Sequence, residues 1–158
     1  MTTGRAPLLV LAAGNPSRGD DALGPLLAAR LEAAQLSQVE VLCDFQWQVE
    51  NALDIEGREL VVFVDAGIGT ATPFELREIT PGGRLLHTSH ALAPEAVLAT
   101  YVQVTGKTAP PALLLCVRGE SFELGEPVSP AALAHLESAW DRLRQLCESD
   151  WEQFSVQR

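Results

Sequence analysis

Short apolar runs alternate with longer amphipathic segments along this chain. Each run is bounded by glycine, proline or polar residues, which is typical of β-strands. The runs LVVFV and FELREI differ in pattern: the first is continuously apolar like a buried strand, and the second alternates like an edge strand. The predicted strands are residues 8–13, 39–43, 60–64, 74–79 and 113–117.

The segments between these runs predict helices. Residues 21–34 and 94–104 carry apolar side chains at helical spacing, and residues 48–55 fit a short helix. A further helix begins at Pro130, with Ser129 as its N-cap, and its apolar positions continue to residue 146.

Strands that alternate with helices favour a mostly parallel sheet. We therefore expect one three-layer α/β domain, in which about five strands form a twisted sheet and about four helices cover both of its faces. A chain of 158 residues suffices for one such domain. We place the domain in residues 1–148 and expect residues 149–158 to be a loosely held tail.

The charge narrows the classes of partner. The formal net charge is −10, which argues against nucleic acid and against an anionic membrane surface. Such a charge suits a basic partner or a metal cation, and equally a protein that is simply kept in solution. The apolar run near the N-terminus is too short for a signal peptide or a membrane span, so we expect a cytoplasmic protein.

The cysteines predict no covalent framework. Cys43 and Cys116 lie within apolar runs, where buried free thiols are expected, and Cys147 is the third. An odd number of cysteines without a CxxC pair argues against both disulfides and a zinc knuckle.

Two loops that follow strands carry the candidate chemistry. The stretch GNPSRGDDALG holds Asp20 and Asp21 after the first strand, and VVFVDAGIG places Asp65 at the end of the third. If the first strand lies beside the third, both loops open into one crevice at the carboxyl ends of the strands, where α/β sheets bind ligands.

Each candidate also has a structural interpretation. One of the paired aspartates is expected to cap the following helix, and Asp65 could cap its own loop. His90, in HTSHALAP, and His87 nearby are more typical of surface residues in a loop, and His135, in the last helix, is expected to be structural or exposed. Two carboxylates and an imidazole would nevertheless form a three-ligand set for zinc or nickel, with positions left for water or substrate.

Four stretches give the sequence a family resemblance. VLAAGNPSRGDDALGPLLAARL, LVVFVDAGIG, LHTSHALAPEAVLA and LLLCVRGESFELGEPVSPAAL resemble the hydrogenase maturation proteases in order and spacing. The resemblance covers residues 8–146, and its opening motif, GNxxxGDDxxGP, is its most specific part.

The resemblance implies an α/β fold and an endopeptidase activity. Such a protease removes a C-terminal peptide from the nickel-loaded large-subunit precursor of a nickel–iron hydrogenase. The nickel is carried by the substrate and serves as the recognition signal, so no tightly bound cofactor of the protease's own is expected. The family's nickel-binding positions fall on Asp21, Asp65 and His90, with Asp20 as a possible second carboxylate. Either the metal or an aspartate would activate water.

One departure points to a branch of that family. Many members carry a DGG stretch after the second strand, where this chain has CDFQWQVENALDI with Asp44 and no glycine pair. The segment resembles the branch that serves cytoplasmic, NAD(P)-linked hydrogenases. Gln46, Trp47 and Gln48 would then line the crevice, although Trp47 could equally pack in the core.

Two other functions compete with a processing protease. One is an assembly chaperone that senses nickel in the precursor without cutting it. The other is an unrelated zinc peptidase of similar fold. HExxH and GxSxG motifs are absent from the sequence, so the usual hydrolase signatures do not decide between these functions.

Overall fold

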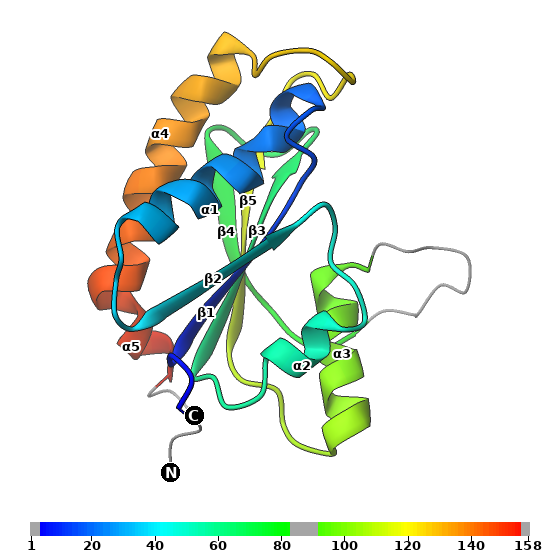
Figure 1. The fold of residues 1–158 in the computed structure, drawn as a ribbon, viewed down its shortest axis with the longest axis vertical. Coiled ribbons are helices and arrows are strands. Elements are labelled where there is room, and N and C mark those ends of the chain that lie inside the picture. The colour runs from blue at the N-terminus through cyan, green and yellow to red at the C-terminus, as the bar shows by residue number, and fades with distance from the viewer. Residues whose placement is uncertain (1–3, 83–91, 156–158) are drawn as a thin grey trace.

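A single five-stranded sheet runs through the molecule (Figure 1). The computed structural model describes residues 4–82 and 92–155. The strand order is β2-β1-β3-β5-β4, and β4 alone runs antiparallel to its neighbour. The strands are β1 (Leu8–Ala13), β2 (Val39–Asp44), β3 (Leu60–Gly67), β4 (Phe74–Ile79) and β5 (Ala112–Arg118). The predicted fold class, the neighbouring first and third strands and the edge position of β4 are all confirmed.

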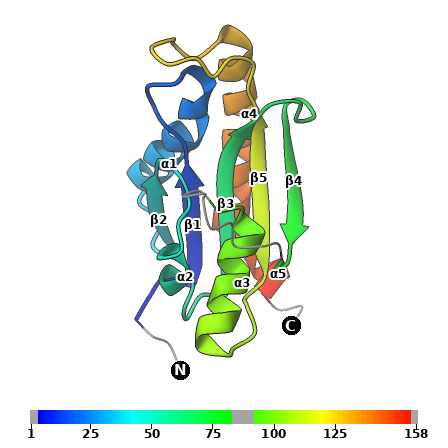
Figure 2. The same cartoon turned by 90° about the vertical axis from the view of Figure 1, so that its right-hand side faces the viewer.

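Helices cover both faces of the sheet. One face carries α1 (Leu23–Ala33) and α4 (Pro130–Gln145), and the other carries α2 (Asn51–Asp54) and α3 (Pro94–Thr105), as Figures 1 and 2 show. α2 is shorter than the predicted helix at residues 48–55.

Alternation along the strands produces two cores. In β1, Leu8 and Val10 face the layer of α1 and α4, whereas Leu9 and Leu11 face the layer of α2 and α3. Because both faces of the central strands are covered, β1 is buried over its whole length, as its continuous apolar run predicts.

The local sequence explains where the longer helices begin and end. The Ser129 hydroxyl accepts a hydrogen bond from the Ala132 amide at 3.2 Å, and Pro130 follows it at the first position of α4. α3 also begins at a proline, and Gly106 caps its C-terminal end with a φ of 69°, a left-handed conformation that glycine adopts without strain.

Two predictions are wrong. Residues 149–155 are not a loose tail: a π-helical turn (Leu146–Asp150) and α5 (Trp151–Ser155) extend α4, and Trp151 is buried in the core beneath α1 and α4. Burial of its large apolar ring stabilises the packing of the C-terminal helix against the core. Cys43 is exposed rather than buried, because β2 lies at the edge of the sheet and, among the described strands, pairs with β1 alone.

Within residues 4–82 and 92–155, no helix has the length and apolar character that a membrane crossing requires.

Candidate functional site

The site lies where β1 and β3 diverge. Their pairing ends at Ala12 and Val64, whereas β3 continues along β5 as far as Gly67. A cleft of about 270 Å³ opens just beyond, lined by Ala13, Asp21 and Asp65 among others. This is the point at which the strand order reverses direction, where α/β sheets characteristically bind ligands.

Asp21 reaches the cleft from a short 3-10 turn (Gly19–Ala22) between β1 and α1. Its Oδ2 accepts a hydrogen bond from the Asn15 amide at 2.7 Å, which fixes the carboxylate while leaving its other oxygen outside that bond. The turn packs so tightly against the end of β1 that a Cβ on Gly14 would lie only 2.1 Å from the Asp21 carbonyl oxygen. The glycine at position 14 therefore permits Asp21 to stand at the mouth of the cleft.

Asp65 enters the same cleft from β3. The strand runs two residues past it, so Asp65 lies within the ladder, opposite Cys116, and not at the tip as predicted. Burial raises the pKa of the Asp65 carboxyl from 3.8 to about 7; the hydrogen bond from the Ala66 amide lowers it, and the charge of Asp21 raises it. A carboxylate with a pKa near neutrality can exchange a proton at physiological pH.

Asp20 does not share the cleft. It is fully buried and accepts hydrogen bonds from the Glu120, Ser121 and Ser129 amides and from the Ser129 hydroxyl, at 2.6–3.1 Å. Burial by itself would raise its pKa, but these four donors outweigh that effect and lower it. The full burial of Asp20 and its position outside the cleft do not support a catalytic role for it. The expected helix cap is wrong, since neither aspartate caps the 3-10 turn or α1.

The segment between β2 and α2 forms one wall of the cleft. Gln46 and Trp47 line the cleft as predicted, and Phe45, which the sequence had not indicated, joins them, whereas Gln48 is not among the lining residues. Both interpretations of Trp47 hold: it is 6% exposed, packs edge-to-face on Phe63, and donates its indole N–H to the Leu11 carbonyl. An aromatic residue directly after a strand end is the signal that could have identified Phe45.

The predicted third ligand, His90, lies outside the described residues, as does His87. The chain is described again from Leu92, which lines the cleft together with Ala93 and Pro94. His135 stands elsewhere, on α4, with its Nδ1 3.1 Å from the Arg118 carbonyl oxygen. Among the residues that the structure describes, no three histidine, cysteine or acidic side chains converge as a metal site.

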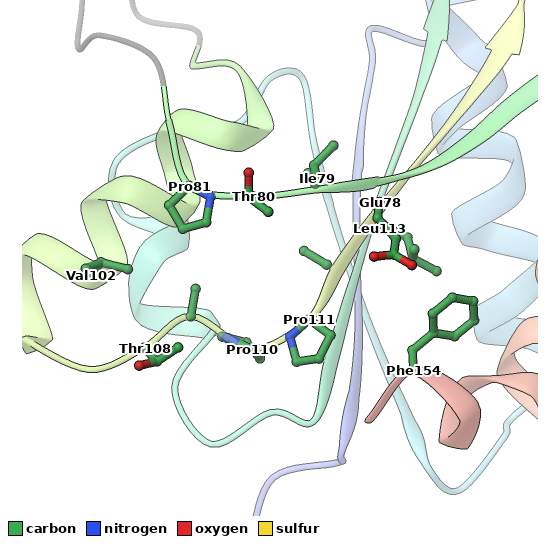
Figure 3. A pocket seen from close by; sticks show the side chains of 12 residues that line it. Glu78, Ile79, Thr80, Pro81, Val102, Thr108, Pro110, Pro111, Leu113 and Phe154 are labelled. Carbon is green, nitrogen blue, oxygen red and sulfur yellow. The ribbon is translucent and has the colours of Figure 1, made fainter. Parts of the chain in front are cut away.

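A larger cavity lies at the opposite end of the sheet. Its volume is about 840 Å³, and its walls come from the end of β4, the start of β5 and Phe154 (Figure 3). Prolines and aliphatic side chains dominate the lining, with Glu78 as its ionisable group. The paired carboxylates, and with them the candidate chemistry, belong to the smaller cleft.

The cleft thus combines a fixed carboxylate, Asp21, with a second one, Asp65, whose pKa lies near neutrality. Oxygen ligands of this kind can complete the coordination of a divalent metal, and a carboxylate with such a pKa can act as a general base toward water. The fold and the site define a three-layer α/β protein with an acidic cleft at the carboxyl ends of its strands.

Solved structures with this fold include hydrogenase maturation proteases. The [NiFe] hydrogenase maturation protease HycI of Thermococcus kodakarensis matches with a TM-score of 0.69 and 24% identity, over 93% of this chain and 96% of that one. The hydrogenase maturating endopeptidase HybD of Escherichia coli matches with a TM-score of 0.71 and 24% identity, over 90% and 93%. An endopeptidase of Escherichia coli matches with a TM-score of 0.66 and 25% identity, over 90% and 93%.

No family model and no curated protein matches the chain. The structural neighbours confirm the resemblance to hydrogenase maturation proteases at the level of the fold. The assignment to a branch that serves NAD(P)-linked hydrogenases stays a prediction.

Proposed function

We propose that this protein is an endopeptidase that removes a C-terminal peptide from the nickel-loaded large-subunit precursor of a nickel–iron hydrogenase. The observation that carries the proposal is the meeting of Asp21 and Asp65 in one cleft, at the strand ends of a fold shared with hydrogenase maturation proteases. The reaction takes place in the cytoplasm, and the nickel is carried by the substrate.

Recognition depends on the metal. The precursor holds nickel through its own thiolates, and Asp21, Asp65 and His90 complete the coordination sphere. An empty precursor lacks these bonds and binds more weakly, so the protease discriminates by a difference in affinity. Cleavage is thereby restricted to precursors that have received their metal.

Hydrolysis then needs an activated water. A water near the cleft loses a proton to an aspartate or is polarised by the nickel, and its oxygen attacks the scissile carbonyl. The peptide C–N bond breaks, the new carboxylate stays on the large subunit, and the proton goes to the departing amine. Asp21 and Asp65, the two carboxylates that line the cleft, are the candidates for the aspartate that takes up this proton.

The deciding experiment mixes the purified protein with a hydrogenase large-subunit precursor, with and without nickel, and measures the intact mass of the precursor. Asp21→Ala, Asp65→Ala and His90→Ala are compared with wild type. Asp141→Ala, at an exposed position on α4, is the matched control. We expect loss of a C-terminal peptide only with nickel, and no loss with any of the three site variants.

The other outcomes identify the competing functions. A stable complex whose precursor mass never changes supports a nickel-sensing chaperone and refutes the protease. Stoichiometric zinc in the purified protein, together with cleavage of short peptides in the absence of nickel, supports a zinc peptidase.

A further inference from the structure

Asp20 and Asp21 are adjacent in sequence and point in different directions. They lie in a 3-10 turn, whose three residues per turn separate consecutive side chains by about a third of a revolution. Asp21 faces the cleft, whereas Asp20 enters the protein between the turn and the brace. The brace is our name for residues 118–129, which are the last residue of β5 and the segment that joins β5 to α4.

The Asp20 carboxylate is anchored entirely by the brace. Its Oδ1 accepts the Ser129 amide at 2.7 Å, and its Oδ2 accepts the Glu120 amide at 2.6 Å, the Ser121 amide at 3.1 Å and the Ser129 hydroxyl at 2.8 Å. None of these donors carries a formal charge. A fully buried carboxylate surrounded by four aimed donors is held in one orientation, because any other would leave the charge unsolvated.

Backbone contacts reinforce this attachment. The Asp20 amide donates to the Ser121 carbonyl at 2.8 Å, and the Gly125 amide donates to the Ser17 carbonyl at 2.7 Å. A Cβ on Gly19 would lie 2.5 Å from the Ser121 carbonyl oxygen, so the two segments are in direct backbone contact. The turn that carries Asp21 therefore takes its position from the brace as well as from β1.

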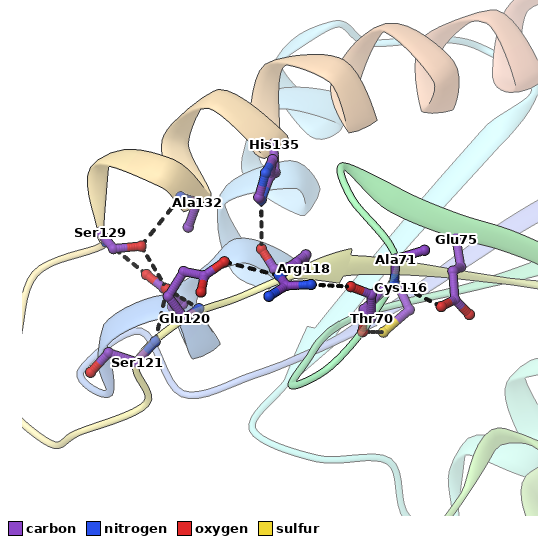
Figure 4. Close-up of polar contacts among 11 residues, drawn as sticks. Thr70, Ala71, Glu75, Cys116, Arg118, Glu120, Ser121, Ser129, Ala132 and His135 are labelled. Atoms are coloured by element: carbon purple, nitrogen blue, oxygen red, sulfur yellow. Dashed lines mark hydrogen bonds and ion pairs between the residues drawn. The ribbon is translucent and has the colours of Figure 1, made fainter.

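The brace also holds the other half of the cleft. The Gly119 amide donates to the Gly67 carbonyl at 2.9 Å, at the end of the strand that carries Asp65. Arg118 donates to the Thr70 carbonyl at 3.0 Å and pairs with Glu120 at 3.0 Å. Figure 4 shows polar contacts from Ser129, at the start of α4, through Glu120 and Arg118 at the end of β5, to Thr70.

We propose that the brace sets the separation of Asp21 and Asp65, and that Asp20 is the positioning residue through which it acts on Asp21. This inference rests on the proposed function for its catalytic consequence. Asp20 contacts neither substrate nor metal; it orients the turn so that Asp21 lies against the Asn15 amide on one side and the cleft on the other.

The test replaces acceptors and donors in this anchor, and only Asp20→Asn does so without a change of side-chain volume. Asp20→Asn turns one carboxylate oxygen into an amide donor that faces N–H groups. Ser129→Ala removes the hydroxyl that donates to Asp20 and also caps α4, and it is the milder variant should Asp20→Asn fold poorly. Ser129→Thr keeps a hydroxyl for both hydrogen bonds. Arg58→Gln is the matched control, because Arg58 is a buried charge beside the start of β3, at the other end of the sheet, where it pairs with Glu40 and donates to the Ala6 and Asp54 carbonyls.

Two readouts separate positioning from mere stability. The first is the backbone amide resonance of Asn15 in the ¹H–¹⁵N spectrum, which reports the hydrogen bond to Asp21. The second is precursor processing, for which we expect kcat to fall about 10²-fold in Asp20→Asn with KM changed less than about twofold. Ser129→Ala should show smaller changes in the same directions, Ser129→Thr should restore wild-type behaviour, and Arg58→Gln should change neither readout.

An Asn15 resonance that stays at its wild-type position in both Asp20→Asn and Ser129→Ala would overturn the proposal. So would a loss of kcat in Arg58→Gln equal to that in Asp20→Asn. If the wild-type protein processes no precursor, the proposed function fails, yet the Asn15 resonance still decides whether the brace positions Asp21.

Discussion

Replacement of Asp65 by asparagine is predicted to stabilise the protein at alkaline pH. Burial is the main cause that raises the pKa of Asp65 from 3.8 to about 7. Between these two values the folded state retains a proton that the unfolded state has lost. Stability is therefore fully present below pH 3.8 and is lost as the pH rises toward and through 7.

The difference between the two pKa values, 3.8 and about 7, corresponds to roughly 4 kcal/mol of unfolding free energy. Asparagine has the same shape as the protonated aspartic acid and never ionises. Asp65→Asn should thus match wild type at pH 4 and exceed it by up to about 4 kcal/mol at pH 8.

The assay is urea denaturation at pH 4, 5, 6, 7 and 8 in the presence of a chelator, followed by tryptophan fluorescence. Trp47, Trp140 and Trp151 are all buried, so unfolding exposes each of them. Asp141→Asn, at an exposed position on α4, controls for the loss of a negative charge. A variant that is less stable than wild type at pH 8, or a difference that does not depend on pH, would refute the assignment of the raised pKa to burial.

Three further predictions concern the fold. Asp20→Asn should lower the free energy of unfolding by about 3 kcal/mol at pH 7, measured by urea denaturation, because buried donors lose their acceptor. The extra stability of the wild-type protein should decline as the pH falls below 3.8, since the pKa of Asp20 is lowered. Gly24→Ala should lower the melting temperature although alanine favours helices, because its Cβ would lie 2.2 Å from the Ala13 carbonyl oxygen; Gly82→Ala, where the nearest atom is 4.0 Å away, should not. Trp151→Ala should lower the free energy of unfolding by about 3–5 kcal/mol in the same assay, because the ring is buried in the core. A loss below about 1 kcal/mol would indicate that the C-terminal residues are loosely held after all.

The sequence by itself determined those strands and helix starts that depend only on neighbouring residues. Val, Leu and Phe in LVVFV predicted a central buried strand, and the alternation in FELREI predicted an edge strand, since period and composition record how many faces are covered. Ser129 before Pro130 predicted the start of α4 for the same reason: a cap is a contact within a single turn. The fold class followed from the order of these elements.

Only part of the candidate site could be predicted from the sequence. The sequence placed Asp21 and Asp65 after strands, and their convergence followed once β1 and β3 were assumed to be neighbours. Whether each carboxylate is exposed, and at what pKa, depends on burial and on neighbours that are remote in the chain. Phe45, which was not predicted from the sequence, also lines the cleft, and its place there likewise depends on the tertiary structure.

Only the tertiary structure could separate the two adjacent aspartates. Asp20 and Asp21 have identical side chains and nearly the same local sequence, so no local rule assigns one to the interior and the other to the cleft. The donors that hold Asp20 lie about a hundred residues further along the chain, in the brace, and exist as an anchor only after β5 has been placed beside β3. Periodicity and capping are properties of neighbouring residues, whereas a buried charge is stabilised by groups that folding alone brings together.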